Sequence, residues 1–288
     1  MRAGTINKQG LPIYHVDAFT DQSFRGNPAA VCLLDREHED RILQSVAAEM
    51  NLSETAFLRT KTAQPFTDAY RFFLRWFTPK TEVPLCGHAT LAAAAVLFYD
   101  VGVSAPELFF ETRSGTLTAS IEPSQICLNF PVNRSIPVGP IPAILKAMGI
   151  SEFEEAQISR KSRKLLVHLA SEEAVRGLKP NFERLKSIKT TYDILGIIAT
   201  AKGEPPYDFV SRFFAPWVGI NEDPVTGAAH TVLAPYWSKK LRKTRMLAYQ
   251  VSERGGELTV DLRVKGRVDL IGKAVIVSKG ELLLPVTG

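Results

Sequence analysis

Cysteine is scarce in this chain, and long hydrophobic runs are absent. The 288 residues include three cysteines, Cys32, Cys86 and Cys127, which are too few and odd in number for a disulfide framework and indicate a reducing compartment. The longest apolar run, 91–99, is far shorter than the roughly 18 residues that suggest a membrane span. The polar residues 1–10 lack the apolar core of a secretory signal. We therefore expect a cytoplasmic protein that does not enter a membrane.

Cofactor motifs are missing as well. The sequence has neither a phosphate-binding Walker loop nor a dinucleotide fingerprint. Cys86 and His88 flank Gly87, but one cysteine and one histidine do not complete a zinc site. We expect no cofactor and no metal.

Positive charge is in slight excess, with a net charge of +5. This excess raises the question of whether the protein binds an acidic partner. The basic residues gather at 160–164 and 239–245, where no interleaved aromatic residues form a nucleic-acid-binding signature. We interpret both clusters as solvated faces and expect no nucleic acid. The excess weakly favours a small anionic substrate.

The composition, 45% hydrophobic and 23% charged, is that of a globular protein, and its two halves resemble each other. Three segments recur in the same order 137, 140 and 141 residues later: 75–79 as 212–216, 87–91 as 227–233, and 113–118 as 254–259. A repeat of about half the chain indicates two similar domains. We predict domains at 1–130 and 131–278, with the proline-rich 131–142 as a linker and about 279–288 as a segment that could complete the first domain.

Each half carries an apolar helix that begins at a glycine. Residues 88–99 are apolar on every side, which predicts a buried helix, and the matching helix begins at 226–229, with His230 inside it as a packing or hydrogen-bonding residue. The free N–H groups at a helix start favour an anion. Two such starts facing one interdomain cleft could hold a substrate carboxylate.

Ionisable residues lie beside both helix starts. Glu54 begins a short strand after a helix at 40–50; partial desolvation there would raise its pKa and suit it to proton transfer, although spacing alone favours a structural acid. His88 lies at the first helix start, and Asp223 lies four residues before Gly227. This set suits the movement of a proton on and off a carbon next to a carboxylate.

Four motifs together resemble the PhzF, or phenazine biosynthesis-like, family of isomerases, and the resemblance runs nearly end to end. They are Gly26-Asn27-Pro28-Ala29-Ala30-Val31, Met50-Asn51-Leu52-Ser53-Glu54-Thr55-Ala56-Phe57, Trp76-Phe77-Thr78-Pro79 with Leu85-Cys86-Gly87-His88-Ala89-Thr90, and Glu222-Asp223-Pro224-Val225-Thr226-Gly227.

The resemblance implies the diaminopimelate-epimerase-like α/β fold, in which each of two pseudosymmetric domains wraps a sheet around a central apolar helix. It implies Glu54 as the acid/base, His88 and Asp223 as positioning residues, no cofactor and a homodimer. It also implies that the substrate is bound by five further residues: Asn27, Gly87, Thr226, Gly227 and Ala228. Ala228 departs from the bacterial phenazine enzyme, which has a serine there, so the bacterial substrate is in doubt.

Two alternatives stay open. Cys86 lies where the first thiol of a two-thiol epimerase would lie, but the matching position holds Thr226, which is too weak an acid to exchange the second proton. A protein that keeps the fold but binds a partner without turnover is the other alternative, and animal members of the family suggest a WD-repeat partner.

Overall fold

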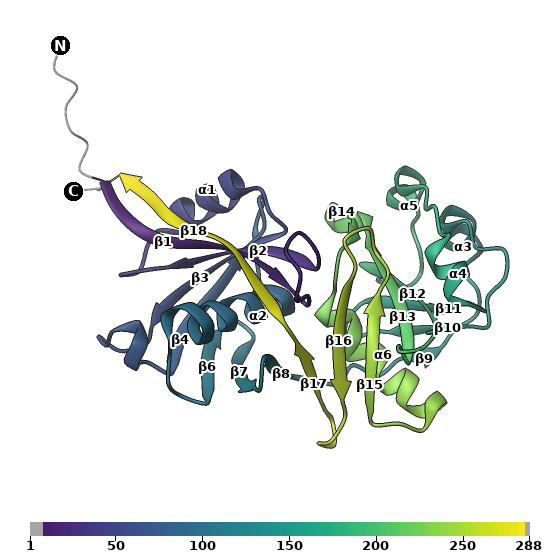
Figure 1. Ribbon diagram of the computed structural model, residues 1–288. Coiled ribbons are helices and arrows are strands. Elements are labelled where there is room, and N and C mark those ends of the chain that lie inside the picture. Colours follow the sequence, from purple (N-terminus) through teal and green to yellow (C-terminus); the bar gives the residue numbers. More distant parts are fainter. Residues whose placement is uncertain (1–7, 286–288) are drawn as a thin grey trace, which may run out of the picture. The chain divides into compact units, whose positions relative to one another are not determined.

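The computed structural model describes residues 8–285, which divide into two compact units (Figure 1). The first unit contains the chain up to Phe24, then Pro28–Ile126 and the C-terminal segment from Ala274; the second contains Arg25–Asn27 and Cys127–Lys273. The proline-rich 131–142 therefore lies within the second unit. Two predictions fall partly outside the described residues: the absence of a secretory signal in residues 1–10, and the completing segment 279–288.

The first unit consists mainly of strands around one helix. Its elements are β1 (Lys8–Ala18), β2 (Asn27–Leu33), α1 (Asp40–Met50), β3 (Glu54–Thr60), η1 (Phe66–Asp68), β4 (Arg71–Phe77), β5 (Glu82–Val83), α2 (Gly87–Ala95), the π-helix η2 (Val96–Val101), β6 (Glu107–Thr112), β7 (Gly115–Glu122) and β18 (Ala274–Pro285).

The second unit follows the same plan with more helices. Its elements are β8 (Gln125–Pro131), β9 (Ile136–Pro137), α3 (Pro142–Met148), β10 (Glu155–Ser159), β11 (Lys164–His168), α4 (Glu172–Arg176), α5 (Phe182–Ser187), β12 (Gly196–Lys202), β13 (Phe209–Ala215), η3 (Pro216–Val218), β14 (Ile220–Asp223), α6 (Gly227–Leu241), β15 (Arg245–Gln250), β16 (Gly256–Asp261) and β17 (Arg267–Gly272).

Strand pairing repeats between the units. In the first unit β2 and β3 are parallel, β3 and β4 antiparallel, β4 and β6 parallel, and β6 and β7 antiparallel. In the second unit the same four relations join β11 with β12, β12 with β13, β13 with β15, and β15 with β16. The helices α2 and α6 occupy equivalent places in this order, so the internal repeat of the sequence is also a repeat of topology.

A buried helix lies at the centre of the first unit. Residues 88–95 of α2 are all buried, as an apolar surface on every side predicts, and α2 lies among the strands of its unit in Figure 1. Helix α1 packs on the other face of the sheet, where Leu43 and Val46 meet Cys32 and Phe57. Because side chains alternate along a strand, Phe57 faces α1 while Glu54 and Ala56 face the side of α2.

Two predicted elements differ from the structure. The helix expected over 88–99 is α-helical only to Ala95 and continues as the π-helix η2, where Tyr99 is 41% exposed. Lys279-Gly280 also predicts a turn, but the structure has one strand there, β18, which pairs with β1 along its whole length. A long partner strand overrides the turn that Lys279-Gly280 suggests.

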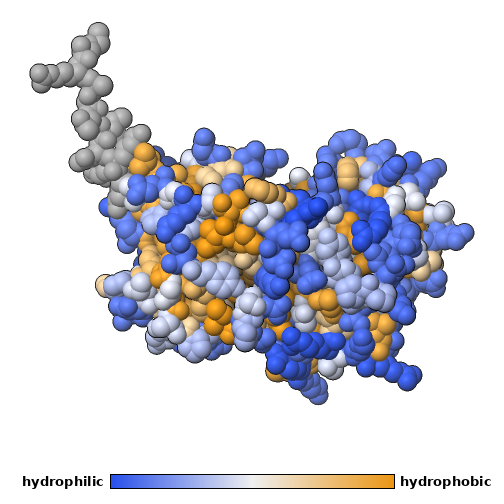
Figure 2. Space-filling view, viewed as in Figure 1, coloured by the Kyte–Doolittle hydropathy of each residue, from blue (hydrophilic) through white to orange (hydrophobic). Residues whose placement is uncertain are grey.

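The surface view shows mostly hydrophilic residues, with hydrophobic residues in patches between them (Figure 2). Within residues 8–285, no helix is both long enough and apolar enough to cross a membrane.

Candidate active site

Glu54 occupies a protected position in the first unit. It is the first residue of β3, directly after the turn that ends α1, and it is 8% exposed. Its register partner in β2 is Ala29, a small residue that leaves room beside the carboxylate. The sequence places Glu54 at a strand mouth, and the structure agrees.

His88 and Cys86 lie against Glu54. The Nε2 atom of His88 is 3.1 Å from Oε2 of Glu54, and its Nδ1 atom is 3.5 Å from Sγ of Cys86. Helix α2 begins at Gly87, so Cys86 is its N-cap and His88 lies in its first turn. Thr90 fixes this start because its hydroxyl donates to the carbonyl of Cys86 at 2.5 Å. A carboxylate, an imidazole and a thiol thus form one buried group.

The charges in this group depend on one another. Burial raises the pKa of the Cys86 thiol, and the Glu54 carboxylate raises it further, so Cys86 stays a thiol at neutral pH. Burial by itself lowers the pKa of His88, but the pKa lies well above its ordinary value because Cys86 and Glu54 favour the imidazolium. A neutral thiol carries no charge, so we attribute the rise to Glu54. The pair resembles an ion pair of imidazolium and carboxylate.

Asp223 lies in a hydrogen-bonded group of the second unit. Its Oδ1 accepts from Nδ2 of Asn27 at 2.7 Å, and its Oδ2 accepts from the Thr226 hydroxyl at 2.5 Å. Asn27 also donates to the carbonyl of Val225 at 2.9 Å, and Asn27 is fully buried. These contacts fix the Asp223 carboxylate just before the start of α6.

Gln250 completes this group, although no sequence motif predicts it. Its Nε2 donates to the backbone carbonyl of Asp223 at 2.6 Å, and its Oε1 accepts from the N–H of Thr226 at 3.0 Å. Gln250 ends β15 and is fully buried. No motif marks it, because it lies 24 residues after Thr226 and only the parallel pairing of β15 with β13 brings it here.

Lys164 is a second residue near Asp223 that no sequence motif predicts. It belongs to the basic run 160–164, which suggests a solvated face, yet it is half-buried at the start of β11. Burial lowers its pKa to about 8, while Asp223 acts in the opposite direction. Its ammonium lies 5.7 Å from the ring centre of Phe213. A partly desolvated cation therefore acts electrostatically on Asp223.

The start of α6 is the counterpart of the start of α2. Helix α6 begins at Gly227 with Thr226 as N-cap, and the Thr226 side chain makes no capping hydrogen bond to the helix. Ala228 presents only a methyl group where a serine would offer a hydroxyl. The carbonyl of Thr226 accepts from the ring of His230 at 2.8 Å, as the carbonyl of Cys86 accepts from Thr90.

The predicted site residues thus fall into two sets. Glu54, Gly87 and His88 come together in the first unit with Cys86. The second unit brings together the residues Asn27, Asp223, Thr226, Gly227 and Ala228.

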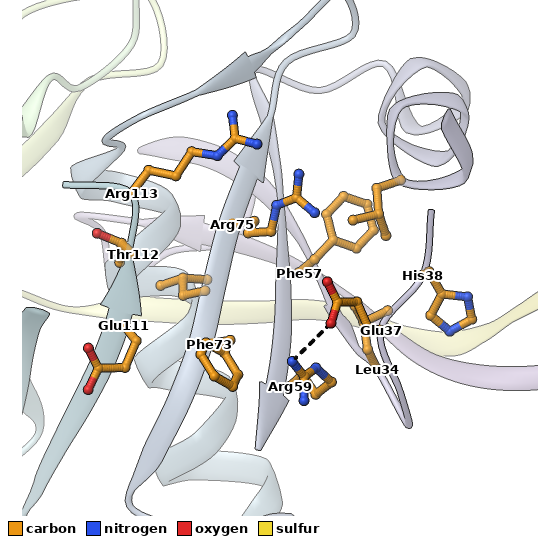
Figure 3. A pocket seen from close by; sticks show the side chains of 12 residues that line it. Leu34, Glu37, His38, Phe57, Arg59, Phe73, Arg75, Glu111, Thr112 and Arg113 are labelled. Atoms are coloured by element: carbon orange, nitrogen blue, oxygen red, sulfur yellow. Dashed lines mark ion pairs between the residues drawn. The ribbon is translucent and has the colours of Figure 1, made fainter. Parts of the chain in front are cut away.

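A pocket of about 400 Å³ lies elsewhere on the first unit (Figure 3). Its lining includes none of the predicted site residues. Phe57 and Phe73 form part of its wall, and Arg59, Arg75 and Arg113 surround it. Each of these arginines is paired with an acid: Arg59 with Glu37, and both Arg75 and Arg113 with Glu82. Because these acids already neutralise the arginines, the pocket is a poor candidate for binding an anionic substrate.

Comparison with known proteins identifies relatives over nearly the whole chain. Residues 16–280 match the family described as phenazine biosynthesis-like protein, PhzC-PhzF. Phenazine biosynthesis-like domain-containing protein 1 of Mus musculus is 52% identical, over 94% of this chain and 99% of its own length. A protein of Halalkalibacterium halodurans named an uncharacterized isomerase is 48% identical, over 95% of this chain and 98% of its own.

Solved structures agree with the fold. A PhzF-family protein of Enterococcus faecalis superposes with a TM-score of 0.88 at 41% identity, covering 96% of this chain and 100% of that one. A hydroxyproline epimerase of Agrobacterium vitis superposes with a TM-score of 0.57 at 11% identity over 96% of this chain and 93% of its own, a likeness of fold alone. The predicted fold class, two pseudosymmetric epimerase-like domains, is confirmed.

Proposed function

The chain belongs to the phenazine biosynthesis-like, PhzC-PhzF, family, and on that premise we propose that it is an isomerase that moves a proton at a carbon next to a substrate carboxylate. A 48% identical relative is named an isomerase, which supports the reaction class. The observation that carries the proposal is the buried contact of Glu54 with His88 at the start of α2.

Glu54 is the acid/base in this proposal. Its carboxylate takes a proton from a substrate C–H bond, whose electron pair moves toward the neighbouring carboxylate or double bond. Glu54, now a carboxylic acid, returns the proton to another carbon of the substrate. The substrate keeps its composition and the enzyme returns to its starting state, so no oxidant or further reactant is needed.

His88 prepares Glu54 for this step. At 3.1 Å the imidazolium stabilises the ionised carboxylate, which is the form that accepts a proton. The start of α2 adds backbone N–H groups and the positive end of a helix dipole, which favour the negative charge that develops on the substrate. Positioned proton transfer of this kind contributes about 10²–10⁴-fold to a rate.

The group around Asp223 positions the same substrate in this proposal. Asp223 and Asn27 are held by hydrogen bonds, and the free amides at the start of α6 suit a carboxylate. Because Ala228 offers no hydroxyl, we propose a substrate other than that of the bacterial phenazine enzyme. That both groups line one interdomain cleft stays a prediction from the sequence repeat.

Solvent deuterium exchange tests this function. A panel of small carboxylates is incubated with the protein in D₂O and read by mass spectrometry, with wild type, Glu54→Gln and the matched control Glu49→Gln, an exposed acid of α1. We expect deuterium at a carbon near the carboxylate with wild type and Glu49→Gln, and at least about a 100-fold loss with Glu54→Gln. Exchange that survives in Glu54→Gln would remove Glu54 from its role. An absence of exchange across the panel would favour a partner-binding protein.

A further inference from the structure

We propose that Cys86, His88 and Glu54 form a binding site for one divalent transition-metal ion of the Zn²⁺ type. The sequence shows a cysteine and a histidine around Gly87, which is one donor too few. The structure adds the carboxylate of Glu54 from β3. One donor atom from each of the three residues can be chosen so that all lie within 4.8 Å of one another, and all three residues are buried.

The distance between the sulfur and nitrogen donors is close to that of a zinc site. Zinc binds thiolate at about 2.3 Å and imidazole at about 2.0–2.1 Å in a tetrahedral arrangement, which places these two donors about 3.6 Å apart. Sγ of Cys86 and Nδ1 of His88 are 3.5 Å apart. Because Glu54 faces the other ring nitrogen, binding requires a rotation of the imidazole or carboxylate that directs one donor atom from each residue to the ion.

Charge balance favours a divalent ion in this buried place. A thiolate, a carboxylate and a neutral imidazole carry a total charge of −2, which a divalent cation neutralises. Buried charges are tolerated when they are paired or coordinate a metal. Without an ion, burial keeps Cys86 protonated and Glu54 favours the imidazolium of His88, so binding must release the thiol proton and one imidazolium proton to solvent.

The donor set selects among metals. Mg²⁺ and Ca²⁺ take oxygen ligands, which leaves sulfur and imidazole nitrogen unused. A thiolate, an imidazole and a carboxylate suit Zn²⁺, for which three protein ligands leave a fourth position open. Metal binding would also occupy the carboxylate that the proposed isomerase uses. This consequence rests on the proposed function: the ion would act as a reversible inhibitor of proton transfer.

Metal titration of the whole chain without substrate tests the site. Metal-free protein is titrated with Co²⁺ as a spectroscopic probe, and Zn²⁺ affinity is measured by competition with a chromogenic chelator. We expect one ion per chain, a thiolate-to-cobalt absorption band, and weaker binding as the pH falls. Cys86→Ser should lose the band and bind Zn²⁺ at least about tenfold more weakly. Cys32→Ala, which alters a buried cysteine of β2 that packs with Leu43 and Val46 of α1, should keep both.

A second variant guards against misfolding of Cys86→Ser. Glu54→Gln keeps the thiolate band but should bind Zn²⁺ more weakly, because an amide oxygen carries no charge. Absence of stoichiometric binding by wild type, or a band that persists in Cys86→Ser, overturns the proposal. Since no substrate is used, a negative result leaves the proposed isomerase intact, and failure of the isomerase leaves the metal site intact.

Discussion

His230 and His88 are both buried histidines, yet their surroundings give them opposite charge. His230 is fully buried in α6, and its ring donates from Nδ1 to the carbonyl of Thr226. Burial lowers its pKa to about 4, so it is neutral. His88 contacts the carboxylate of Glu54, which raises its pKa. His230 therefore stabilises the start of α6 as a neutral residue, whereas His88 can carry a positive charge.

The neutral state of His230 predicts a loss of stability in acid. The folded pKa of about 4 lies below the unfolded value of roughly 6.5, so the unfolded chain binds the extra proton between these values. The contribution is complete above pH 6.5 and decreases as the pH falls toward 4, by on the order of 3 kcal/mol. His230→Asn keeps a donor without this titration. Urea unfolding from pH 7 to 4.5 should show a smaller loss for the variant; parallel profiles would contradict this.

At the scale of residues, the motifs predicted Glu54, His88 and Asp223, and also Asn27 and Thr226, which contact Asp223. They did not predict Gln250 or Lys164. Cys86 and His88 are only two residues apart, so their contact could be predicted. Gln250 could not, because a strand pairing brings it to Thr226. Lys164 could not, because it belongs to a basic run that looks solvated, whereas the structure half-buries it at the start of the buried strand β11.

At the scale of elements, the repeat includes an ion pair in each unit. Arg75 of β4 makes two hydrogen bonds with Glu82 of β5, and Arg212 of β13 makes two with Glu222 of β14. Each pair joins the strand that precedes a central helix to the connection leading into that helix. This shared ion pair explains why both repeated segments, 75–79 and 212–216, begin with an arginine.

The two arginines differ in burial, and this predicts different costs of substitution. The Arg212 side chain is 12% exposed and also donates to the carbonyls of Val175, Arg176 and Leu178, whereas that of Arg75 is 25% exposed. Lysine cannot make the paired contact together with these others. We expect Arg212→Lys to lower the free energy of unfolding by about 2–3 kcal/mol, and Arg75→Lys by about 1 kcal/mol. Chemical denaturation measures both; equal costs would contradict the prediction.

The element boundaries show where periodicity fails as a guide. Hydrophobic periodicity located the helix α1 and the buried start of α2 because each has a defined apolar pattern. It does not mark β10 and β15, because strands of five and six residues are too short to show a sustained pattern. It also fails at β18, where Gly280 suggests a turn that pairing with β1 overrides.

For the whole molecule, the C-terminal strand belongs to the first unit. β18 comes after the entire second unit in the sequence, yet it pairs with β1. The first unit is therefore complete only when the last residues are present. The sequence suggested such a completing segment at about 279–288, whereas the strand begins at Ala274.

Ending the chain at Lys273 should thus unfold the first unit selectively. Hydrogen exchange read by mass spectrometry should show that amides of β3 and β4 lose protection, because β1 loses its long partner strand. Amides of α6, in the second unit, should keep theirs. Unchanged protection in β3 and β4 would show that β18 is dispensable.

The expected homodimer and WD-repeat partner stay predictions, which sedimentation and affinity capture can address.

The central claim is that a carboxylate, and not a thiol, moves the proton. The most direct measurement is the rate of solvent deuterium exchange into one active substrate for wild type, Glu54→Gln and Cys86→Ser. We expect Glu54→Gln to lose about 10²–10⁴-fold, and Cys86→Ser to lose less than about tenfold, because serine can still face His88. The reverse order, with exchange lost in Cys86→Ser and kept in Glu54→Gln, would contradict the account and identify a thiol-based epimerase.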